Sequence, residues 1–334
     1  MQLLAEYNLE VLAYSDMDSL TRRTFLERLT ALAAGGLLAG GLQNAGATAP
    51  SEPHISFPSA PRDRIAVASY PFRAYIDSPT NRNRDPNLPG MDLAEFASAV
   101  VAKFAVHNIE PHSRHFRSLD PAYLGGFREA LRKASVTVVD IPVSVEESFY
   151  DADAAARNRA IGVAKKWVDV AAEVGSLSIR PHIKGTANSS PNLQQAADSL
   201  LNVAEYAAEK NVVVHLENDD LVSEDAFFLV RVIEAVNNPY LRALPDFANS
   251  ALAGDSEFNY RALQAMFQHA YGICHIKDGE TDDQGKQFSI DLKRGFDILK
   301  ASGFRGYCSM EFDAPGEPYG PTAKLIEQSI RYLS

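Results

Sequence analysis

Short apolar runs alternate with longer amphipathic segments along most of the chain. The runs are rich in β-branched residues, as buried strands are, whereas the apolar residues of the segments between them recur with the period of a helix. Several of these segments begin just after a Ser, Asp or Asn, which are residues that cap helix N-termini. The pattern predicts eight strands, at residues 65–70, 105–111, 136–143, 176–182, 212–217, 241–247, 272–277 and 306–312.

The spacing of these runs indicates how the strands are connected. Most successive strands are 30 to 40 residues apart, the length of a strand and a helix joined by a right-handed crossover. Eight such units over residues 65–334 predict an α/β fold, a single-domain (β/α)8 TIM barrel. A doubly wound open sheet is the alternative, because one missed or false strand would change the count. No glycine-rich phosphate-binding turn follows the first run, which argues against a dinucleotide-binding fold.

The first 47 residues have a different pattern. Arg22 and Arg23 precede an uncharged Gly/Ala/Leu stretch at residues 31–42. This order predicts a twin-arginine signal peptide over residues 1–47, with Met17 as a candidate for the true start. The uncharged stretch has 12 residues, too few to cross a bilayer of roughly 30 Å as a helix, so we expect no stable membrane anchor.

We therefore expect export by the twin-arginine machinery to the periplasm or out of the cell. That machinery carries folded proteins, so a metal ion could be loaded before export. A Pro/Ser-rich linker at residues 48–64 would then lead into the barrel. An ordinary amphipathic N-terminal helix is the alternative interpretation of the leading segment.

Composition and charge limit the partners. A chain of 334 residues of which 46% are hydrophobic can bury a large core. The net charge is −11 and the isoelectric point about 5.2, and no run of lysines or arginines interrupts the main body. A nucleic-acid or anionic-membrane surface is therefore disfavoured.

Four ligand-type side chains stand at the ends of four consecutive predicted strands. They are separated by 29, 29 and 36 residues, about one βα unit each. Because working residues of a TIM barrel lie at the C-terminal ends of its strands, all four should meet at one mouth. Three carboxylates and an imidazole suit one divalent ion, Mn²⁺, Co²⁺, Mg²⁺ or Zn²⁺. The predicted metal ligands are Glu217, Asp246, His275 and Glu311.

Polar and basic side chains are expected around the same mouth. Such groups could hold sugar hydroxyls or a carboxylate, or protonate a leaving oxygen. For His112, the alternative is a polar loop residue that packs on its neighbours. The predicted substrate-binding residues are His112, Arg180, His182, Lys184, Asn249 and Lys277.

The strand ends "VVVHLEN", "LPDF", "CHIKDG" and "MEFD" resemble those of the xylose-isomerase-like barrels. That superfamily contains sugar isomerases, ketose 3-epimerases, inosose-handling enzymes and class-II apurinic endonucleases. The resemblance implies a metal held by the four residues above, with Glu217 and Glu311 also acting as the acid and base. It covers the chain from about residue 64 onward and does not single out one activity.

Two positions depart from particular branches of that superfamily. Ketose epimerases usually have a histidine three residues after the metal-binding aspartate and an arginine six residues after the histidine ligand. This chain has Asn249 and Thr281 there, so it does not fit the usual ketose 3-epimerase. The endonucleases need further histidines for three zinc ions, including one at the position of Asn249, which with the acidic charge argues against DNA cleavage.

The sequence thus predicts a metal-dependent sugar isomerase or epimerase that acts through an enediolate on an unphosphorylated or oxidised sugar. A lyase or hydratase acting on 3-keto-sugars or keto-glycosides is the first alternative, because it starts from the same enolate. A non-catalytic sugar-binding barrel is the alternative from another class. The sequence sets neither the sugar, the metal nor the oligomeric state, and a homo-oligomer is compatible with it.

Overall fold

The computed structural model describes residues 51–185, 190–314 and 316–334. Contacts divide the chain into Met1–Ala49 and Pro50–Ser334, and the second unit contains all the structure described below. The predicted signal peptide lies outside the described residues. Within them, no helix combines the length and the apolar character needed to cross a membrane.

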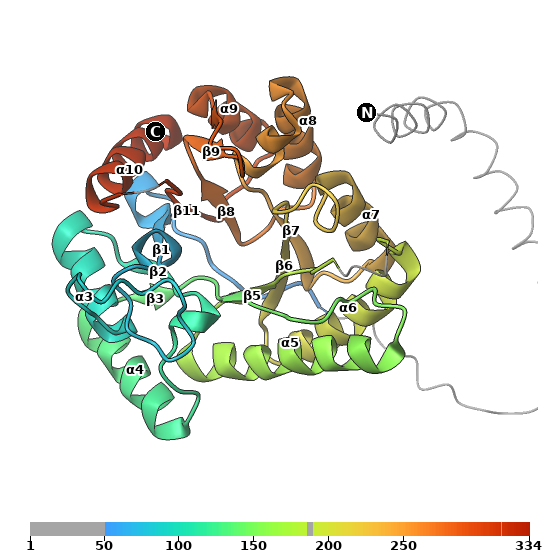
Figure 1. Cartoon of the computed structure of the whole chain (residues 1–334), viewed down its shortest axis with the longest axis horizontal. Helices are drawn as coiled ribbons and strands as arrows, with labels where there is room; N and C mark the ends of the chain where they lie inside the picture. The colour runs from blue at the N-terminus through green and yellow to red at the C-terminus, as the bar shows by residue number, and fades with distance from the viewer. Residues whose placement is uncertain (1–50, 186–189, 315) are drawn as a thin grey trace, which may run out of the picture. The chain divides into compact units, whose positions relative to one another are not determined.

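Parallel strands form the centre of the molecule (Figure 1). Their pairing gives two arrays, in the orders β3-β2-β1-β11-β8 and β4-β5-β6-β7. The strands are β1 (Ile65–Ala68), β2 (Asn108–Glu110), β3 (Thr137–Val138), β4 (Pro142–Val143), β5 (Ser178–Pro181), β6 (Val213–Glu217), β7 (Leu241–Leu244), β8 (Ile273–Ile276) and β11 (Tyr307–Met310).

The two arrays close into one barrel. On one side β3 and β4 are successive pieces of the third predicted strand, and on the other side a parallel bridge joins Asp246 to His275. Every predicted strand therefore has its counterpart in the structure. The predicted (β/α)8 barrel is confirmed, and the open-sheet alternative is wrong.

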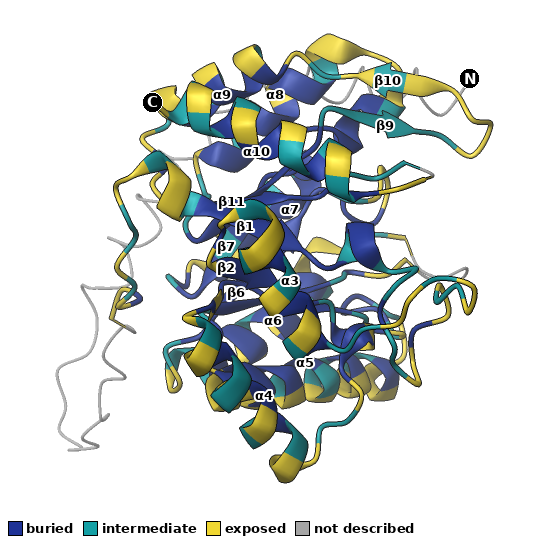
Figure 2. Cartoon of the chain, turned by 90° about the vertical axis from the view of Figure 1, so that its left-hand side faces the viewer, coloured by how far each residue is buried: buried dark blue, intermediate teal, exposed yellow. Residues whose placement is uncertain are grey.

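Helices surround the strands in a ring (Figure 1). Each turns its apolar face to the barrel, so that the buried side of the helix layer is continuous with the core (Figure 2). Asp153 illustrates how the sequence starts these helices, since its carboxylate accepts the N–H groups of Ala155 and Ala156. The helices are α3 (Leu93–Phe104), α4 (Pro121–Ala134), α5 (Ala154–Val174), α6 (Leu193–Ala208), α7 (Ala226–Val236), α8 (Ser256–Phe267), α9 (Leu292–Ala301) and α10 (Tyr319–Leu333).

Residues 51–64, which we call the basal segment, pack against the N-terminal end of the barrel. Phe57 lies edge-on to Tyr271 and Tyr307, with ring centroids 5.3 and 5.9 Å apart. The hydroxyl of Tyr271 donates a hydrogen bond to the carbonyl of Pro53. The described part of the predicted linker is thus attached to the barrel by packing and hydrogen bonds.

A short antiparallel hairpin follows β8 and was not predicted. Its strands are β9 (Gly279–Thr281) and β10 (Gln287–Ser289). The sequence here is polar and lacks the apolar run by which the barrel strands were recognised. The hairpin matters for the site because it places Glu280 beside Lys277.

Candidate metal and active site

The four predicted metal ligands come together at the C-terminal ends of their strands. Glu217 ends β6, Asp246 follows β7, His275 lies in β8 and Glu311 follows β11. None is more than 5% exposed, and one ligand atom from each lies within 4.8 Å of the others. We call these residues the quartet. Four separate βα units thus deliver one side chain each to a single buried point.

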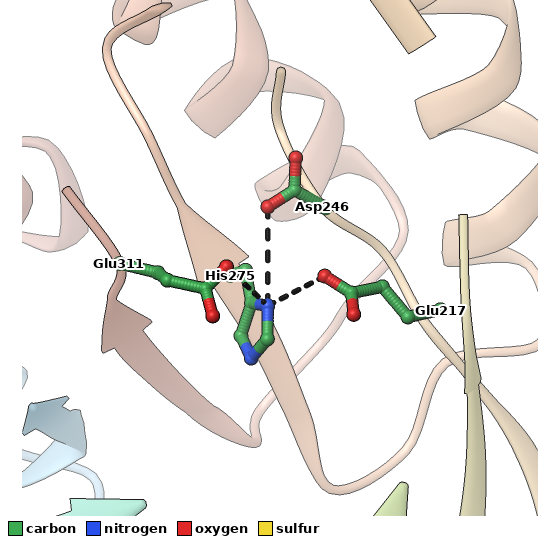
Figure 3. Close-up of side chains that lie close together, drawn as sticks. All are labelled: Glu217, Asp246, His275 and Glu311. Carbon is green, nitrogen blue, oxygen red and sulfur yellow. Dashed lines mark hydrogen bonds and ion pairs between the residues drawn. The ribbon is translucent and has the colours of Figure 1, made fainter. Parts of the chain in front are cut away.

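His275 occupies the centre of the quartet. Its Nδ1 atom lies 2.7 Å from Glu217 Oε1, 3.1 Å from Glu311 Oε2 and 3.9 Å from Asp246 Oδ2. Figure 3 shows the three carboxylates converging on this nitrogen from different strands. The Nδ1 atom therefore lies where three negative groups require a positive charge.

Glu110 contacts the other ring nitrogen of the same imidazole. It ends β2, is fully buried, and accepts a hydrogen bond of 2.8 Å from His275 Nε2. Such a carboxylate fixes the ring orientation and leaves Nδ1 as the atom that faces a metal ion. Reasoning from the sequence places Glu110 at the mouth of the barrel but does not predict its contact with His275. Its position at the end of the second predicted strand was the available signal.

The pKa values reflect this concentration of charge. Burial lowers the pKa of His275, but Glu110, Glu311 and Glu217 together raise it well above its usual range. Burial raises the pKa of Asp246 to about 7, against the opposing effect of Lys277. Burial also acts to raise the pKa of Glu217, but Arg180 and His275 lower it to about 2.

The residues present fit a divalent cation. Oδ2 of Asp246 is buried without a hydrogen-bond partner, and the nearest cation, Lys277 Nζ, is 3.7 Å away, which is costly unless a closer cation compensates it. The three carboxylates of the quartet and that of Glu110 surround His275 and together carry four negative charges when ionised. Among the described residues, Arg180 and Lys277 are the only buried lysine or arginine side chains that pair with these carboxylates. Metal binding requires the carboxylates ionised and the imidazole neutral, and in that state the difference of two charges is what one divalent ion would offset. The mixed oxygen and nitrogen donors suit the ions predicted above.

Arg180 and His182 extend from the quartet as a chain of polar contacts. Arg180 Nη2 lies 2.9 Å from Glu217 Oε2, and Arg180 Nη1 donates to His182 Nε2 at 2.5 Å. The Nδ1 atom of His182 faces Asp219 and Glu224 at 3.2 and 3.3 Å. The imidazole of His182 thus lies between the guanidinium of Arg180 and the two carboxylates. His182, Asp219 and Glu224 form a second group whose geometry could hold a metal ion, although the guanidinium of Arg180 contacts the same imidazole.

Lys277 and Asn249 also contact the quartet. Lys277 Nζ donates to Asn249 Oδ1 at 2.9 Å and lies 3.2 Å from Glu311 Oε2. Burial acts to lower the pKa of Lys277, but Asp246 and Glu311 raise it well above its usual range. The amide of Asn249 is 3.4 Å from Glu217 Oε1. The structure thus brings both predicted substrate-binding residues into contact with the quartet.

His112 and Lys184 differ in their placement. His112 Nδ1 accepts the backbone N–H of Arg114, and burial lowers the pKa of His112 well below its usual range. The ring is therefore neutral and offers an Nε2–H donor. Lys184 is half exposed and pairs with Glu146 at 2.9 Å. It lines a cavity with His112 and His182 but not the space above the quartet, so the structure separates it from Asn249 and Lys277.

Two spaces open at this end of the barrel. The smaller, which we call the inner hollow, has a volume of about 200 Å³ and is bordered by Glu217, Glu311, Asn249 and Lys277. The larger, the outer cavity, has a volume of about 630 Å³ and is lined by residues that follow β2, β4, β5 and β6. Both spaces have His112 and His182 in their walls. These two histidines therefore mark the boundary between them.

The sequence matches the family described as Xylose isomerase-like TIM barrel over residues 98–334, and the chain belongs to that family. No curated protein matches the sequence at a significant level. The resemblance identified at the strand ends is thereby confirmed at the level of the family.

Solved structures with the same fold include several sugar enzymes. D-allulose 3-epimerase from Methylomonas sp. superposes with a TM-score of 0.61 at 16% identity, covering 83% of this chain and 100% of that one. L-ribulose 3-epimerase gives 0.60 at 18% identity, covering 80% and 96%. The probable 3-DHS dehydratase AsbF from Bacillus anthracis gives 0.56 at 13% identity, covering 79% and 97%. At these identities the similarity establishes the fold alone.

Proposed function

We propose that the protein is a metal-dependent enzyme that isomerises or epimerises an unphosphorylated or oxidised sugar through an enediolate. The observation that carries the proposal is the pair Glu217 and Glu311. Both are buried carboxylates that face the same nitrogen of His275 and border the inner hollow. The fold is shared with sugar epimerases, which supports the choice of substrate class.

The quartet would hold the metal ion. Such an ion, when bound, polarises a carbonyl and its neighbouring hydroxyl and so acidifies the proton on the carbon between them. The chain supplies the groups that move this proton. Burial acts to raise the pKa of Glu311, but His275 and Lys277 lower it well below its usual range, and Glu217 is similarly acidic. Both carboxylates are therefore ionised at neutral pH, so either can accept the proton from the carbon. The carboxyl group that has taken it up can return it to the neighbouring carbon, whereas return from the opposite side requires the second carboxylate to take up a proton from water first.

The neighbouring polar groups would position the sugar. The ammonium of Lys277, the guanidinium of Arg180 and the Nε2–H of His112 all border the inner hollow. They can donate hydrogen bonds to hydroxyl or carbonyl oxygens of the substrate. The orientation of the sugar then determines which carbon recovers the proton, and with it whether the product is an epimer or an isomer.

The charges around the inner hollow support an unphosphorylated substrate. Two cations, Arg180 and Lys277, border it, against the five carboxylates of Glu217, Asp219, Glu280, Glu311 and Asp313. A phosphate group would have to approach this excess of negative charge, which one divalent ion reduces without reversing. A neutral sugar avoids that repulsion.

A lyase acting on a 3-keto-sugar or keto-glycoside is the second candidate. It begins with the same proton removal and ends with loss of a substituent from the adjacent carbon. The observation that favours it is the outer cavity, which opens beside the inner hollow and has room for a departing group. A sugar-binding barrel without catalysis is the third candidate, and the two opposed buried carboxylates argue against it.

Deuterium incorporation separates the three. The metal-loaded enzyme is incubated in D2O with free sugars, 3-keto-sugars and glycosides, beside the variants Glu217→Gln and Glu311→Gln. Deuterium at a carbon next to the carbonyl, without loss of a substituent and abolished in both variants, is the expected result. Release of an aglycone would indicate the lyase, and neither event with any sugar would contradict an enzymatic function.

We also propose that the protein is exported by the twin-arginine route to the periplasm or beyond. Arg22, Arg23 and the uncharged stretch after them support this. Fractionation of cells that express the wild type and the R22K/R23K variant tests it. We expect the variant to accumulate in the cytoplasm, whereas equal distribution of the two proteins would contradict the proposal.

A further inference from the structure

We propose that the outer cavity is a subsite for a second, neutral sugar ring attached to the reacting sugar, so that the natural substrate is a disaccharide or a comparable glycoside. This inference rests on the proposed function, because it takes the inner hollow as the place of reaction. It names the class of substrate that the proposed function leaves open.

The sizes of the two spaces lead to this inference. Pockets that enclose small ligands usually have volumes of roughly 300–1,000 Å³. The inner hollow, at about 200 Å³, is below that range, whereas the outer cavity, at about 630 Å³, lies within it. A substrate confined to the inner hollow would leave the larger space unused. A substrate with two linked parts would occupy both.

The shared wall shows where such a substrate would cross. His112 and His182 border both spaces. The Nε2–H of His112 is a donor not used by the backbone contact of its other nitrogen. A linking oxygen between two sugar rings is an acceptor, and this boundary is where it would lie.

The charges of the outer cavity favour a neutral occupant. Its two exposed cations, Arg114 and Lys184, both pair with one carboxylate, Glu146, at 3.1 and 2.9 Å. Asp220 and Glu224 add two further acids to the lining. With three carboxylates against two cations, the cavity has no surplus positive charge for a phosphate or a uronate. Paired groups of both signs can exchange hydrogen bonds with hydroxyls.

An exposed apolar side chain lies on the same wall. Val222 is 66% exposed, the highest value among the large hydrophobic residues described, and it lines the outer cavity. Its loop is held in place, because Asp220 accepts the N–H groups of Val222 and Ser223 at 2.9 and 2.6 Å. The C–H face of a sugar ring is the kind of surface that would cover such a side chain, while the ring hydroxyls meet the polar groups.

Matched substrates test the subsite. D-fructose is compared with isomaltulose, in which a glucosyl group is attached to fructose, and methyl 3-keto-α-glucoside with 3-keto-trehalose. The metal-loaded enzyme is assayed by deuterium exchange in D2O. We expect kcat/KM for a disaccharide to exceed that for its single ring by about tenfold or more, because the second ring adds binding energy that the chemical step can use. Equal values for both members of each pair would overturn the proposal.

Two tryptophan variants localise the effect. Val222→Trp places bulk in the outer cavity, and we expect it to lower the ratio of disaccharide to single-ring kcat/KM by about tenfold. Leu193→Trp is the matched control, since Leu193 is also an exposed apolar residue but does not line the cavity, and its ratio should equal that of the wild type. The same change in both variants, or none in either, would overturn the proposal.

A binding measurement distinguishes failure of the subsite from failure of the proposed function. If no sugar exchanges deuterium, the proposed function is wrong for this panel. Saturation-transfer NMR with isomaltulose and 3-keto-trehalose then tests the subsite by itself. Contacts to the second ring that are present in the wild type and in Leu193→Trp but weakened in Val222→Trp support it, and their absence from the wild type overturns it.

Discussion

His275 has a carboxylate at each of its two ring nitrogens. Glu110 accepts a hydrogen bond from Nε2, and the rest of the quartet surrounds Nδ1. The hydrogen bond from Nε2 to Glu110 fixes the orientation of the ring and therefore the direction in which Nδ1 faces. At the scale of single residues, the proposed metal site therefore depends on a side chain that would not touch the ion.

Replacing Glu110 tests this dependence. In Glu110→Gln the side chain keeps its shape but loses the charge that makes the imidazole a stronger ligand. We expect the affinity for Mn²⁺ to fall by about 10- to 100-fold, as measured by titration calorimetry and metal content. Glu257→Gln is the control, because Glu257 is an exposed carboxylate paired with Arg294 away from the site. Equal affinity in the wild type and in Glu110→Gln would contradict the assigned role.

His115 gives a pH dependence that does not involve the quartet. It is buried, its Nδ1 lies 2.7 Å from Ser69 Oγ, and burial together with Arg73 lowers its pKa to about 3. Between this value and its unfolded pKa of about 6.5 the unfolded chain binds more protons than the folded protein. Stability contributed by the neutral ring is thus complete above about pH 6.5 and is lost as the pH falls toward 3.

We expect the pH slope of the unfolding free energy to be smaller in His115→Asn. Lowering the pH from 7 to 5.5 should cost the wild type about 1 kcal/mol more than this variant, as measured by urea denaturation at both values. His54→Asn, at an exposed histidine, should keep the slope of the wild type. Identical slopes for the wild type and His115→Asn would show that folding does not lower the pKa of this ring.

At the scale of elements, the two ends of the barrel differ in what they carry: one end carries the quartet and the other is covered by the basal segment. The C-terminal strand ends carry the quartet, and the basal segment covers the opposite end through Phe57. The spacing of apolar runs revealed the strands because each must be buried on both sides. The packing of the basal segment could not be predicted in this way, because its few apolar residues have no period of their own.

The basal segment should therefore affect stability without affecting the metal site. Phe57→Ala removes a partly buried ring from between Tyr271 and Tyr307, and we expect a loss of about 1–2 kcal/mol in the free energy of unfolding. Phe57→Leu should recover part of this loss. Urea denaturation measures the stability and calorimetry the Mn²⁺ affinity. A freely moving linker would give no loss in either variant.

At the scale of the whole molecule, the net charge of −11 includes a concentration of buried acids at one point. Like charges close together oppose folding, and a cation bound only by the folded state favours it. The metal-free protein should therefore be less stable than the loaded one.

Removal and return of the ion test this coupling. With EDTA-treated protein, adding Mn²⁺ at about 100 times its dissociation constant should raise stability by about 2.7 kcal/mol, seen as a higher Tm. Asp246→Asn removes one ligand carboxylate and should reduce the rise. Asp297→Asn, an exposed acid paired with Lys293, should keep it. A Tm that does not respond to any of the predicted ions would contradict the metal site.

The sequence by itself determined the barrel and the identity of the quartet. The strands could be predicted because burial on both sides leaves a long apolar run, and the quartet because each member stands at the end of such a predicted run, about one βα unit from the next. Only the tertiary structure decided what surrounds these residues. The approach of Glu110 to His275, the pairing of Arg180 with Glu217 and the separation of Lys184 from the quartet depend on which side chains from distant strands meet. The residues that neighbour each of these side chains along the chain do not indicate such contacts, because the closure of the barrel brings together strands whose local sequences are independent.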